Sequence, residues 1–234
     1  MRGRIDLNAD LGEGVTDDSG LLAVVTSANV ACGYHAGDAP TMRRVCEEAL
    51  VRGVTVGAQV SYLDRENFGR VSHDLAPDLL TAQVADQVGT LAGIAASVGT
   101  VVSYVKPHGA LYHRVIDDEE QALALLEGAP GLAVLGFPGG AVLRLAAARG
   151  RTVWREGFPD RAYDDRGRLV DRRVRGAVLD DPEEVARRAV ELALAGAVDS
   201  VCVHGDSPSA VASARAVRVA LTAAGLVVVH NDGP

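Results

Sequence analysis

The stretch VVSYVKPHG at residues 101–109 decides the fold class, because a short β-rich run passes directly into polar residues at its end. Residues 101–105 predict a strand, and Lys106 and His108 follow it on one rigid turn. The same order recurs along the chain. Further strand candidates lie at 5–8, 28–32, 55–60, 132–137, 152–156 and 200–204, and an eighth candidate lies at 226–230.

Helical patterns separate these strands. Residues 40–52 and 77–98 repeat apolar side chains at helical spacing, and Gly53 ends the first of them. Asp181-Pro-Glu-Glu184 predicts a helix start with a capping acid, a proline and an acidic first turn. Ser207-Pro208 predicts the start of the last long helix. Such alternation favours parallel strands joined by right-handed crossovers.

The polar residues that follow the strands distinguish a doubly wound sheet from a closed barrel. Almost every strand delivers such a group: Asn8, Asp10, His35, Asp38, Gln59, Lys106, His108, Glu156, His204 and Asp206. A barrel brings all of these ends to one mouth, whereas a doubly wound sheet uses only those at its switch point. We therefore predict an α/β fold, a (β/α) barrel of seven or eight parallel strands, with residues 1–234 as a single catalytic domain.

Composition narrows the function classes. The 234 residues are 48% hydrophobic and 23% charged, which excludes a disordered chain, a collagen-like chain and a disulfide scaffold. The net charge of −8 disfavours binding to nucleic acid or to anionic membranes. Three cysteines without a CxxC pair, no apolar signal segment and no transmembrane pattern favour a cytoplasmic location.

Lys106 is the only lysine among 23 basic residues. A lysine at a strand end can neutralise a phosphate or polarise an oxyanion, and His108 beside it can move a proton near pH 7. A capping role for the histidine is the alternative, and two apt groups on one turn favour function. Asp10 and Glu13 can act as a base and a cation ligand, or as turn and capping acids.

The other polar segments each carry a structural alternative. Asp38 is placed to cap the helix after His35, and Cys32 is interpreted as a small buried strand residue rather than a nucleophile. In the loop after residue 60, Arg70 is a candidate for gripping a carboxylate, whereas for Arg65 we favour a solvated ion pair. The remaining candidates are Glu156, Asp160 and Arg161 after the sixth strand, with Asp160 and Arg161 able to pair, and His204 and Asp206, expected as an anion site beside a helix N-terminus.

No P-loop, no GxGxxG with a distant acid and no HExxH occurs. Six stretches in order nevertheless resemble the LamB/YcsF family, which provides the A subunit of bacterial ATP-dependent 5-oxoprolinase: IDLNADLGEG, SANVACGYHAGDAPTM, VGAQVSYLDRENFGR, YVKPHGALYH, EGFPDRAYDDRGRLVDR and VCVHGDSPSAV. The resemblance implies a barrel like those of glycoside hydrolases and polysaccharide deacetylases. It also implies cleavage of 5-oxo-L-proline to L-glutamate with hydrolysis of ATP to ADP and phosphate, and partner subunits B and C. Gln59-Val60 and Val71 depart from the family's usual His-Pro and arginine.

With that chemistry in view, we assign expected roles. The expected catalytic residues are Asp10, Glu13, His35, Lys106 and His108, with Asp10 and Glu13 holding Mg²⁺ or activating water. Lys106 would meet a phosphate or oxyanion, and Arg70 or Arg161 the substrate carboxylate. Substrate or nucleotide contacts are expected from Asn8, Asp38, Gln59, Arg70, Glu156, Asp160, Arg161, His204 and Asp206, with ATP and Mg²⁺ as cofactors.

Two other functions remain open from the sequence. One is a metal-dependent deacetylase or amidohydrolase on a related barrel, with Asp10, His35, His108 and His204 as ligands. The other is a non-catalytic subunit that presents oxoproline to its partners. The number of acid, base and cationic groups argues against a pure scaffold.

Overall fold

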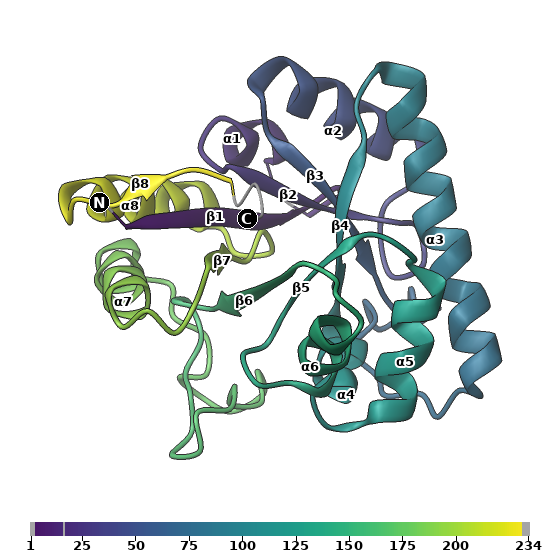
Figure 1. Cartoon of the computed structure of the whole chain (residues 1–234). Helices are drawn as coiled ribbons and strands as arrows, with labels where there is room; N and C mark the ends of the chain where they lie inside the picture. Colours follow the sequence, from purple (N-terminus) through teal and green to yellow (C-terminus); the bar gives the residue numbers. More distant parts are fainter. Residues whose placement is uncertain (1–2, 16, 231–234) are drawn as a thin grey trace.

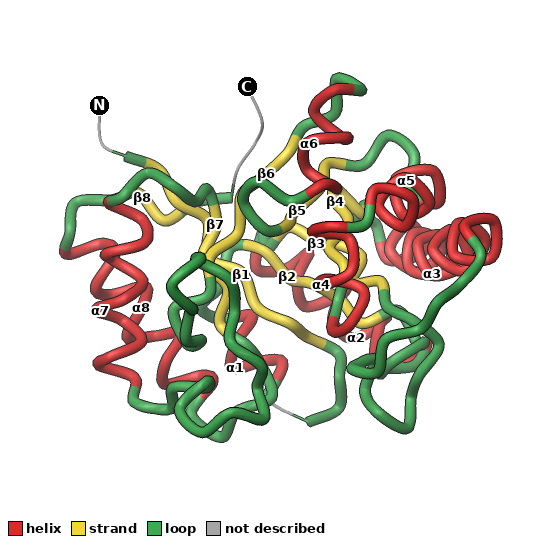
Figure 2. Tube along the Cα trace, turned by 90° about the horizontal axis from the view of Figure 1, so that it is seen from below, coloured by secondary structure: helices red, strands yellow, loops and turns green. Residues whose placement is uncertain are grey.

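The computed structural model describes residues 3–15 and 17–230. Its centre is a closed barrel of seven parallel strands (Figure 1, Figure 2). They are β1 (Arg4–Leu11), β2 (Ser27–Ala31), β3 (Thr55–Val60), β4 (Val102–Pro107), β5 (Ala133–Gly136), β6 (Val153–Gly157) and β7 (Ser200–Val203). Each strand pairs with the next, and β7 returns to pair with β1. The predicted barrel is therefore confirmed, with seven strands in the ring.

The eighth predicted strand lies outside that ring. β8 (Val227–Val228) pairs with Arg4 and Ile5, the first two residues of β1. The carbonyls of Gly3 and Ile5 accept bonds from the amides of Val227 and Val229, and the carbonyl of Leu7 accepts from Thr26 just before β2. Alternate carbonyls of a strand point to the same side, so β8 lies on the β2 side of β1, at the start of that strand.

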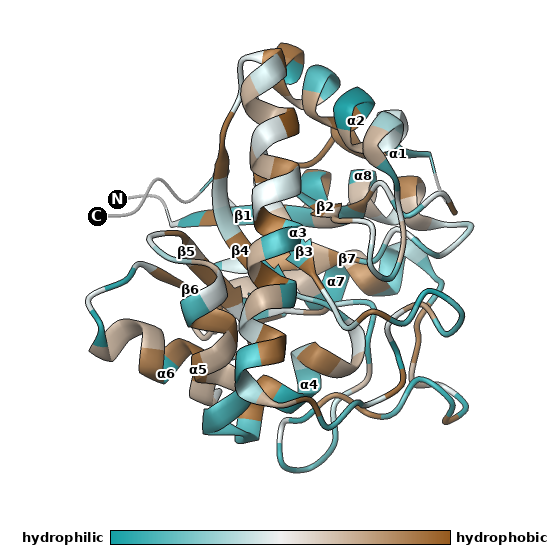
Figure 3. Cartoon of the chain, turned by 90° about the vertical axis from the view of Figure 1, so that its right-hand side faces the viewer, coloured by the Kyte–Doolittle hydropathy of each residue, from teal (hydrophilic) through white to brown (hydrophobic). Residues whose placement is uncertain are grey.

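Eight helices of the described chain surround the barrel (Figure 1). They are α1 (Asp18–Leu22), α2 (Ala39–Arg52), α3 (Pro77–Val98), α4 (Gly109–Asp117), α5 (Glu119–Gly128), α6 (Ala141–Ala148), α7 (Pro182–Leu194) and α8 (Ala210–Ala223). Hydrophobic and hydrophilic stretches alternate along α3 and α5 (Figure 3), as expected for helices that cover a sheet with one face. No helix among the described residues combines the length and the apolar character needed to cross a bilayer.

Three of the four predicted helix starts are confirmed to within a residue, and one is wrong. Asp38 caps α2 by accepting a bond from the Thr41 amide at 2.9 Å, and Asp181 caps α7. The last helix begins at Ala210 rather than at Ser207-Pro208. The Ala210 amide bonds the Ser207 carbonyl, so residues 207–210 form a separate turn before the helix.

The inside of the barrel is polar, in contrast to the apolar layer between strands and helices. We call the buried hydrogen-bonded set Asp6, Asn8, Ser27, Asn29, Tyr104 and Ser200 the barrel network. The Asn29 amide donates to Asn8 at 2.7 Å and to Asp10 at 2.9 Å, and the Tyr104 hydroxyl donates to Asn29 at 2.6 Å. This network crosses the barrel beneath the carboxyl ends of the strands and fixes one oxygen of Asp10 from below.

Candidate active site

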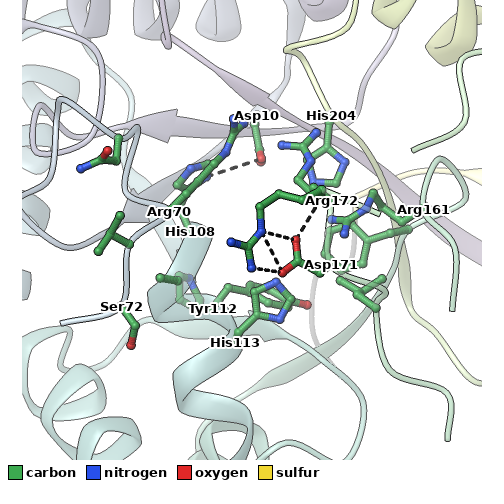
Figure 4. Close-up of a pocket in the computed structure, with 18 of the residues that line it drawn as sticks. Asp10, Arg70, Ser72, His108, Tyr112, His113, Arg161, Asp171, Arg172 and His204 are labelled. Carbon is green, nitrogen blue, oxygen red and sulfur yellow. Dashed lines mark hydrogen bonds and ion pairs between the residues drawn. The ribbon is translucent and has the colours of Figure 1, made fainter. Parts of the chain in front are cut away.

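A cavity of about 820 Å³ opens at the carboxyl ends of the strands. Its labelled side chains in Figure 4 include Arg70 and His108 on one side, His204 and Arg161 on the other, and Tyr112 below. Asp10, Lys106 and Phe158 also line it. The barrel therefore gathers residues from five of the six sequence stretches quoted above around one opening, as parallel barrels do.

Lys106 lies at the floor of this cavity and is only 2% exposed. Its Nζ is 2.8 Å from Asp10 Oδ1 and 2.8 Å from Glu156 Oε1, and it donates to Cys202 Sγ at 3.2 Å. Burial alone would lower the pKa of Lys106, but these three neighbours outweigh it and raise the pKa well above its usual range. Lys106 is therefore a fixed ammonium at neutral pH.

The two carboxyl groups beside Lys106 differ in acidity. Burial opposes ionisation of Asp10, but Lys106, His204 and His108 together hold the pKa of Asp10 well below its usual range. For Glu156, burial prevails over the attraction of Lys106 and raises the pKa. Tyr112 also contacts Glu156. The floor thus combines a permanent carboxylate, an ammonium and a carboxyl group that keeps its proton to higher pH than an ordinary glutamate.

A second group lies beside the floor, and we call Glu13, His35 and His108 the imidazole cluster. The two rings stack with centroids 4.1 Å apart and planes 14° from parallel. Glu13 Oε1 is 3.6 Å from His35 Nε2 and 3.6 Å from His108 Nδ1. Burial, with the nearby His35, lowers the pKa of His108 well below its usual range, whereas burial raises the pKa of Glu13.

Gln59 joins the cluster, as its position at a strand end predicts. Its amide nitrogen donates to Glu13 at 3.0 Å and lies 2.9 Å from His108 Nδ1. The loop after β3, which carries the carboxylate-gripping candidate Arg70, lies over the cluster. Phe68 contacts both imidazoles edge-on with a φ of 58°, a strained backbone conformation for a large side chain.

The rim of the cavity carries the cationic groups. Arg172 donates two bonds to Asp206, at 2.9 and 3.0 Å, and Arg70 reaches the same carboxylate at 2.5 Å. Burial opposes the ionisation of Asp206, but Arg172 prevails and lowers its pKa to about 2. Arg172 was missed from the sequence, because its stretch has no strand end or local pattern that distinguishes it from its neighbour Arg173. Tyr112 was also missed, because it lies within α4 rather than at a strand end.

Several candidate residues after β6 and β7 bond partners within the protein that the sequence did not indicate. Arg161 lines the cavity, but its guanidinium donates to the carbonyls of Ala177 and Val170, so its bonds hold the loop after β6. Asp160 pairs with His204 Nδ1 at 2.9 Å instead of with Arg161. His204 and Asp206 do not form an anion site at a helix N-terminus, because the helix starts four residues later.

Two further candidates lie away from the cavity. Asn8 belongs to the barrel network, where it bonds Ser200 and Asn29. Asp38 serves as the cap of α2. Arg65 donates to the carbonyls of Gly33 and Gly37, a structural role rather than a surface ion pair. Cys32 is buried as expected, and burial raises the pKa of its thiol, which disfavours a nucleophilic role.

The expected metal ligands are also arranged differently. Lys106 donates to Asp10 Oδ1 at 2.8 Å, so this oxygen of the predicted Asp10 and Glu13 pair is already bonded within the protein. The alternative set of Asp10, His35, His108 and His204 does not have metal-ligand spacing as a group, because only His35 and His108 of these belong to one set of close ligand atoms, with Glu13 as its third member. Among the described residues, the group with metal-ligand spacing is the imidazole cluster.

A family model described as the LamB/YcsF family matches residues 5–233. The chain belongs to the LamB/YcsF family. Two relatives, each named as the A subunit of 5-oxoprolinase, support this membership. The protein from Streptomyces avermitilis is 54% identical over 96% of this chain and 98% of its own length, and the protein from Mycobacterium avium is 50% identical over 96% and 97%. The resemblance seen in the six sequence stretches is confirmed.

Solved structures agree with this membership. A lactam utilization protein from Thermus thermophilus matches with a TM-score of 0.89 and 37% identity, over 97% of this chain and 99% of that one. A peptidoglycan N-acetylglucosamine deacetylase domain from Eubacterium rectale matches with a TM-score of 0.57 and 14% identity, over 100% and 91%. At that identity the deacetylase shows a shared fold alone, and it confirms the predicted likeness of this LamB/YcsF barrel to deacetylase barrels.

Proposed function

We propose that this chain is the A subunit of an ATP-dependent 5-oxoprolinase, which opens 5-oxo-L-proline to L-glutamate as ATP is hydrolysed to ADP and phosphate. The observation that carries the proposal is identity of about half, over nearly the full length, to proteins named as the A subunit of 5-oxoprolinase. The whole chain acts as one catalytic domain, and its partners are subunits B and C.

The cavity offers groups that match the two polar ends of the substrate. 5-Oxoproline carries a carboxylate and a cyclic amide. The Arg172 guanidinium on the rim, with Arg70 beside it, can hold the carboxylate, since guanidinium and carboxylate form paired hydrogen bonds. Lys106 on the floor then meets the lactam oxygen, where negative charge develops as the carbonyl is attacked.

Ring opening also requires proton movement. Water adds its oxygen to the carbonyl carbon, and the ring nitrogen leaves with a proton. Asp10 stays ionised beside Lys106 and orients the water, and the neutral imidazole of His108, stacked on His35, accepts its proton. Glu156, whose pKa is raised, is the buried acid beside Lys106 and the proposed source of the proton for the leaving nitrogen.

ATP makes the opening of a stable five-membered lactam favourable. Transfer of its terminal phosphoryl group to the lactam oxygen gives ADP and a better electrophile. One water then adds to the ring carbon and the ring nitrogen leaves, which gives an acyl phosphate, and a second water hydrolyses that acyl phosphate to glutamate and phosphate. No common P-loop occurs in the chain, so nucleotide binding needs other contacts or the partner subunits. The location proposed for this reaction is the cytoplasm, in keeping with three buried, unpaired cysteines.

The test is a coupled assay of ADP and glutamate with 5-oxoproline and ATP. The purified chain is measured alone, the B and C partners alone, and all three together. The expected result is oxoproline-dependent formation of both products in the complete mixture only. The B and C subunits are first shown to be active together with the A subunit of another 5-oxoprolinase. Absence of coupled turnover when this chain replaces that A subunit would refute the proposal.

A further inference from the structure

We propose that the imidazole cluster, Glu13, His35 and His108, is a binding site for one divalent transition-metal ion such as Zn²⁺. One ligand atom from each residue lies within 4.8 Å of the other two, and all three residues are buried. The site differs from the Asp10 and Glu13 pair expected from sequence, and it is independent of the proposed function.

The spacing of the ligand atoms is close to that of a filled site. Bond lengths to zinc of about 2.0–2.2 Å place two ligands of a tetrahedral ion about 3.4 Å apart. Both imidazole nitrogens lie 3.6 Å from Glu13 Oε1. All three ligand atoms also lie within 4.8 Å of one another, so side-chain adjustment alone brings them onto one ion.

His35 gives the second, independent observation. Its side chain is 0% exposed, yet neither Nδ1 nor Nε2 has a hydrogen-bond partner in the structure. Buried polar atoms are nearly always bonded, so an imidazole left in this state indicates a missing partner. Because Nε2 points toward Glu13, an ion bound between the two residues supplies that partner.

His108 is held in the orientation of a metal ligand. Its Nε2 lies 3.2 Å from the Phe68 carbonyl oxygen, which can only accept, so this nitrogen carries the proton. The unprotonated Nδ1 then faces Glu13 and Gln59. Metal-binding histidines are commonly fixed in this way, by donating the other ring N–H to a carbonyl.

The donor set determines the class of ion. Two imidazoles and one carboxylate suit zinc and its neighbours in the first transition row, whereas Mg²⁺ prefers oxygen ligands and water. Gln59 occupies the space between Glu13 and His108, and its amide oxygen has no partner. Rotation of this amide by half a turn presents the oxygen in place of the NH₂ group, which removes a donor from the site. His108 also lines the cavity, so the bound ion lies at the inner edge of the substrate space.

The experiment measures metal binding by the chain alone, without substrate or partners. Protein stripped with a chelator is titrated with Zn²⁺ by calorimetry, and with Co²⁺ while its visible absorption is recorded. The expected result is one ion per chain, an intense absorption typical of four-coordinate Co²⁺, and a rise in Tm with Zn²⁺. His35→Gln and Glu13→Gln should lose the stoichiometric site.

Two further variants serve as a control and as a test for tighter metal binding. His113→Gln removes a histidine that lines the cavity outside the cluster, so it should bind like the wild type. Gln59→His places a further imidazole beside Glu13 and His108 and should tighten binding, a gain that a misfolded variant cannot imitate. No stoichiometric binding by the wild type, or equal binding by the folded His35→Gln variant, would overturn the proposal. Glutamate formation by the assembled enzyme does not enter either result.

Discussion

The barrel network and the imidazole cluster are both polar, both buried and both inside the same barrel, but they differ in how their hydrogen-bonding capacity is used. In the network, Asp6 accepts bonds from Thr26, Ser27 and Ser200, and Asn29 bonds three neighbours. In the cluster, neither ring nitrogen of His35 has a hydrogen-bond partner. Burial of polar groups therefore does not by itself indicate a functional site. Buried polar atoms that lack a hydrogen-bond partner within a well-packed barrel do indicate one.

Lys106 lies between these two regions and shares features of both. The network positions Asp10 through Asn29, and Asp10 in turn holds Lys106. Lys106 also lines the cavity. The barrel network thus positions the reactive groups. Substitutions in the network should lower the free energy of unfolding, whereas substitutions of the reactive groups should lower turnover.

The largest effect is expected for Lys106→Met. Loss of one donor to a developing oxyanion costs about 10²–10³ in kcat, and this variant also removes the charge between Asp10 and Glu156. Turnover by the assembled enzyme should fall by at least that factor, measured as glutamate formed per minute, with circular dichroism to verify the fold. Ser200→Ala, in the barrel network, is the matched control and should keep its turnover. Near-normal activity of Lys106→Met would refute the role of the lysine.

Asn29→Ala tests the network side of the comparison. It removes one buried hydrogen-bond partner from each of Asn8, Asp10 and Tyr104, and it opens a small cavity. The free energy of unfolding should fall by about 2–4 kcal/mol, measured by urea denaturation. Ser97→Ala, which removes a hydroxyl from the exposed face of α3, should change it by less than about 0.5 kcal/mol. Equal stability of the two variants would contradict a structural role for the network.

Arg172→Gln tests the rim. If Arg172 binds the substrate carboxylate, its loss should raise KM for 5-oxoproline by about 10- to 100-fold, the usual effect of one hydrogen bond to a charged group, with a smaller change in kcat. Arg187→Gln, on the outer surface of α7, should leave KM unchanged. An unchanged KM in Arg172→Gln would show that the carboxylate is held elsewhere.

The smallest effect concerns pH. Burial would lower the pKa of His204, but Asp160 prevails and raises it. A histidine whose folded pKa exceeds its unfolded value of about 6.5 adds stability that is complete below that pH and is lost as pH rises through the folded pKa. The stability lost is about 1.4 kcal/mol for each pH unit that separates the two pKa values. Urea midpoints at pH 6 and pH 9 should therefore differ more for the wild type than for Asp160→Asn. An identical pH dependence would show that this pair contributes no such stability.

The fold was predictable because the deciding signals are local. Most strands are short apolar runs that end in a polar residue, as in Val105-Lys106, and several helices have a local cap or stop, such as Asp38 or Gly53. These signals give the order of elements, and chirality rules then leave few topologies. The start of the last helix was wrong because Ser207-Pro208 makes a turn that has the same sequence signature as a helix cap.

The site was predictable only in part, because its contacts join distant segments. Strand-end positions brought Asp10, Lys106 and Glu156 together, since the barrel fixes where strands end. The roles of Arg161 and Arg172 depend instead on how the long loop after β6 folds back, through bridges of Arg161 with Val178 and of Tyr163 with Leu169. No periodic pattern encodes that path, so the sequence could not show that Arg161 bonds backbone carbonyls of the loop whereas Arg172 pairs with Asp206 at the rim.

The most direct test of the account is a crystal structure of the chain with 5-oxo-L-proline bound. The account predicts that the ligand lies in the 820 Å³ cavity, with its lactam oxygen within hydrogen-bonding distance of Lys106 Nζ and its carboxylate on Arg172 or Arg70. A ligand bound outside this cavity, or one bound inside it with the lactam turned away from Lys106, would contradict the account.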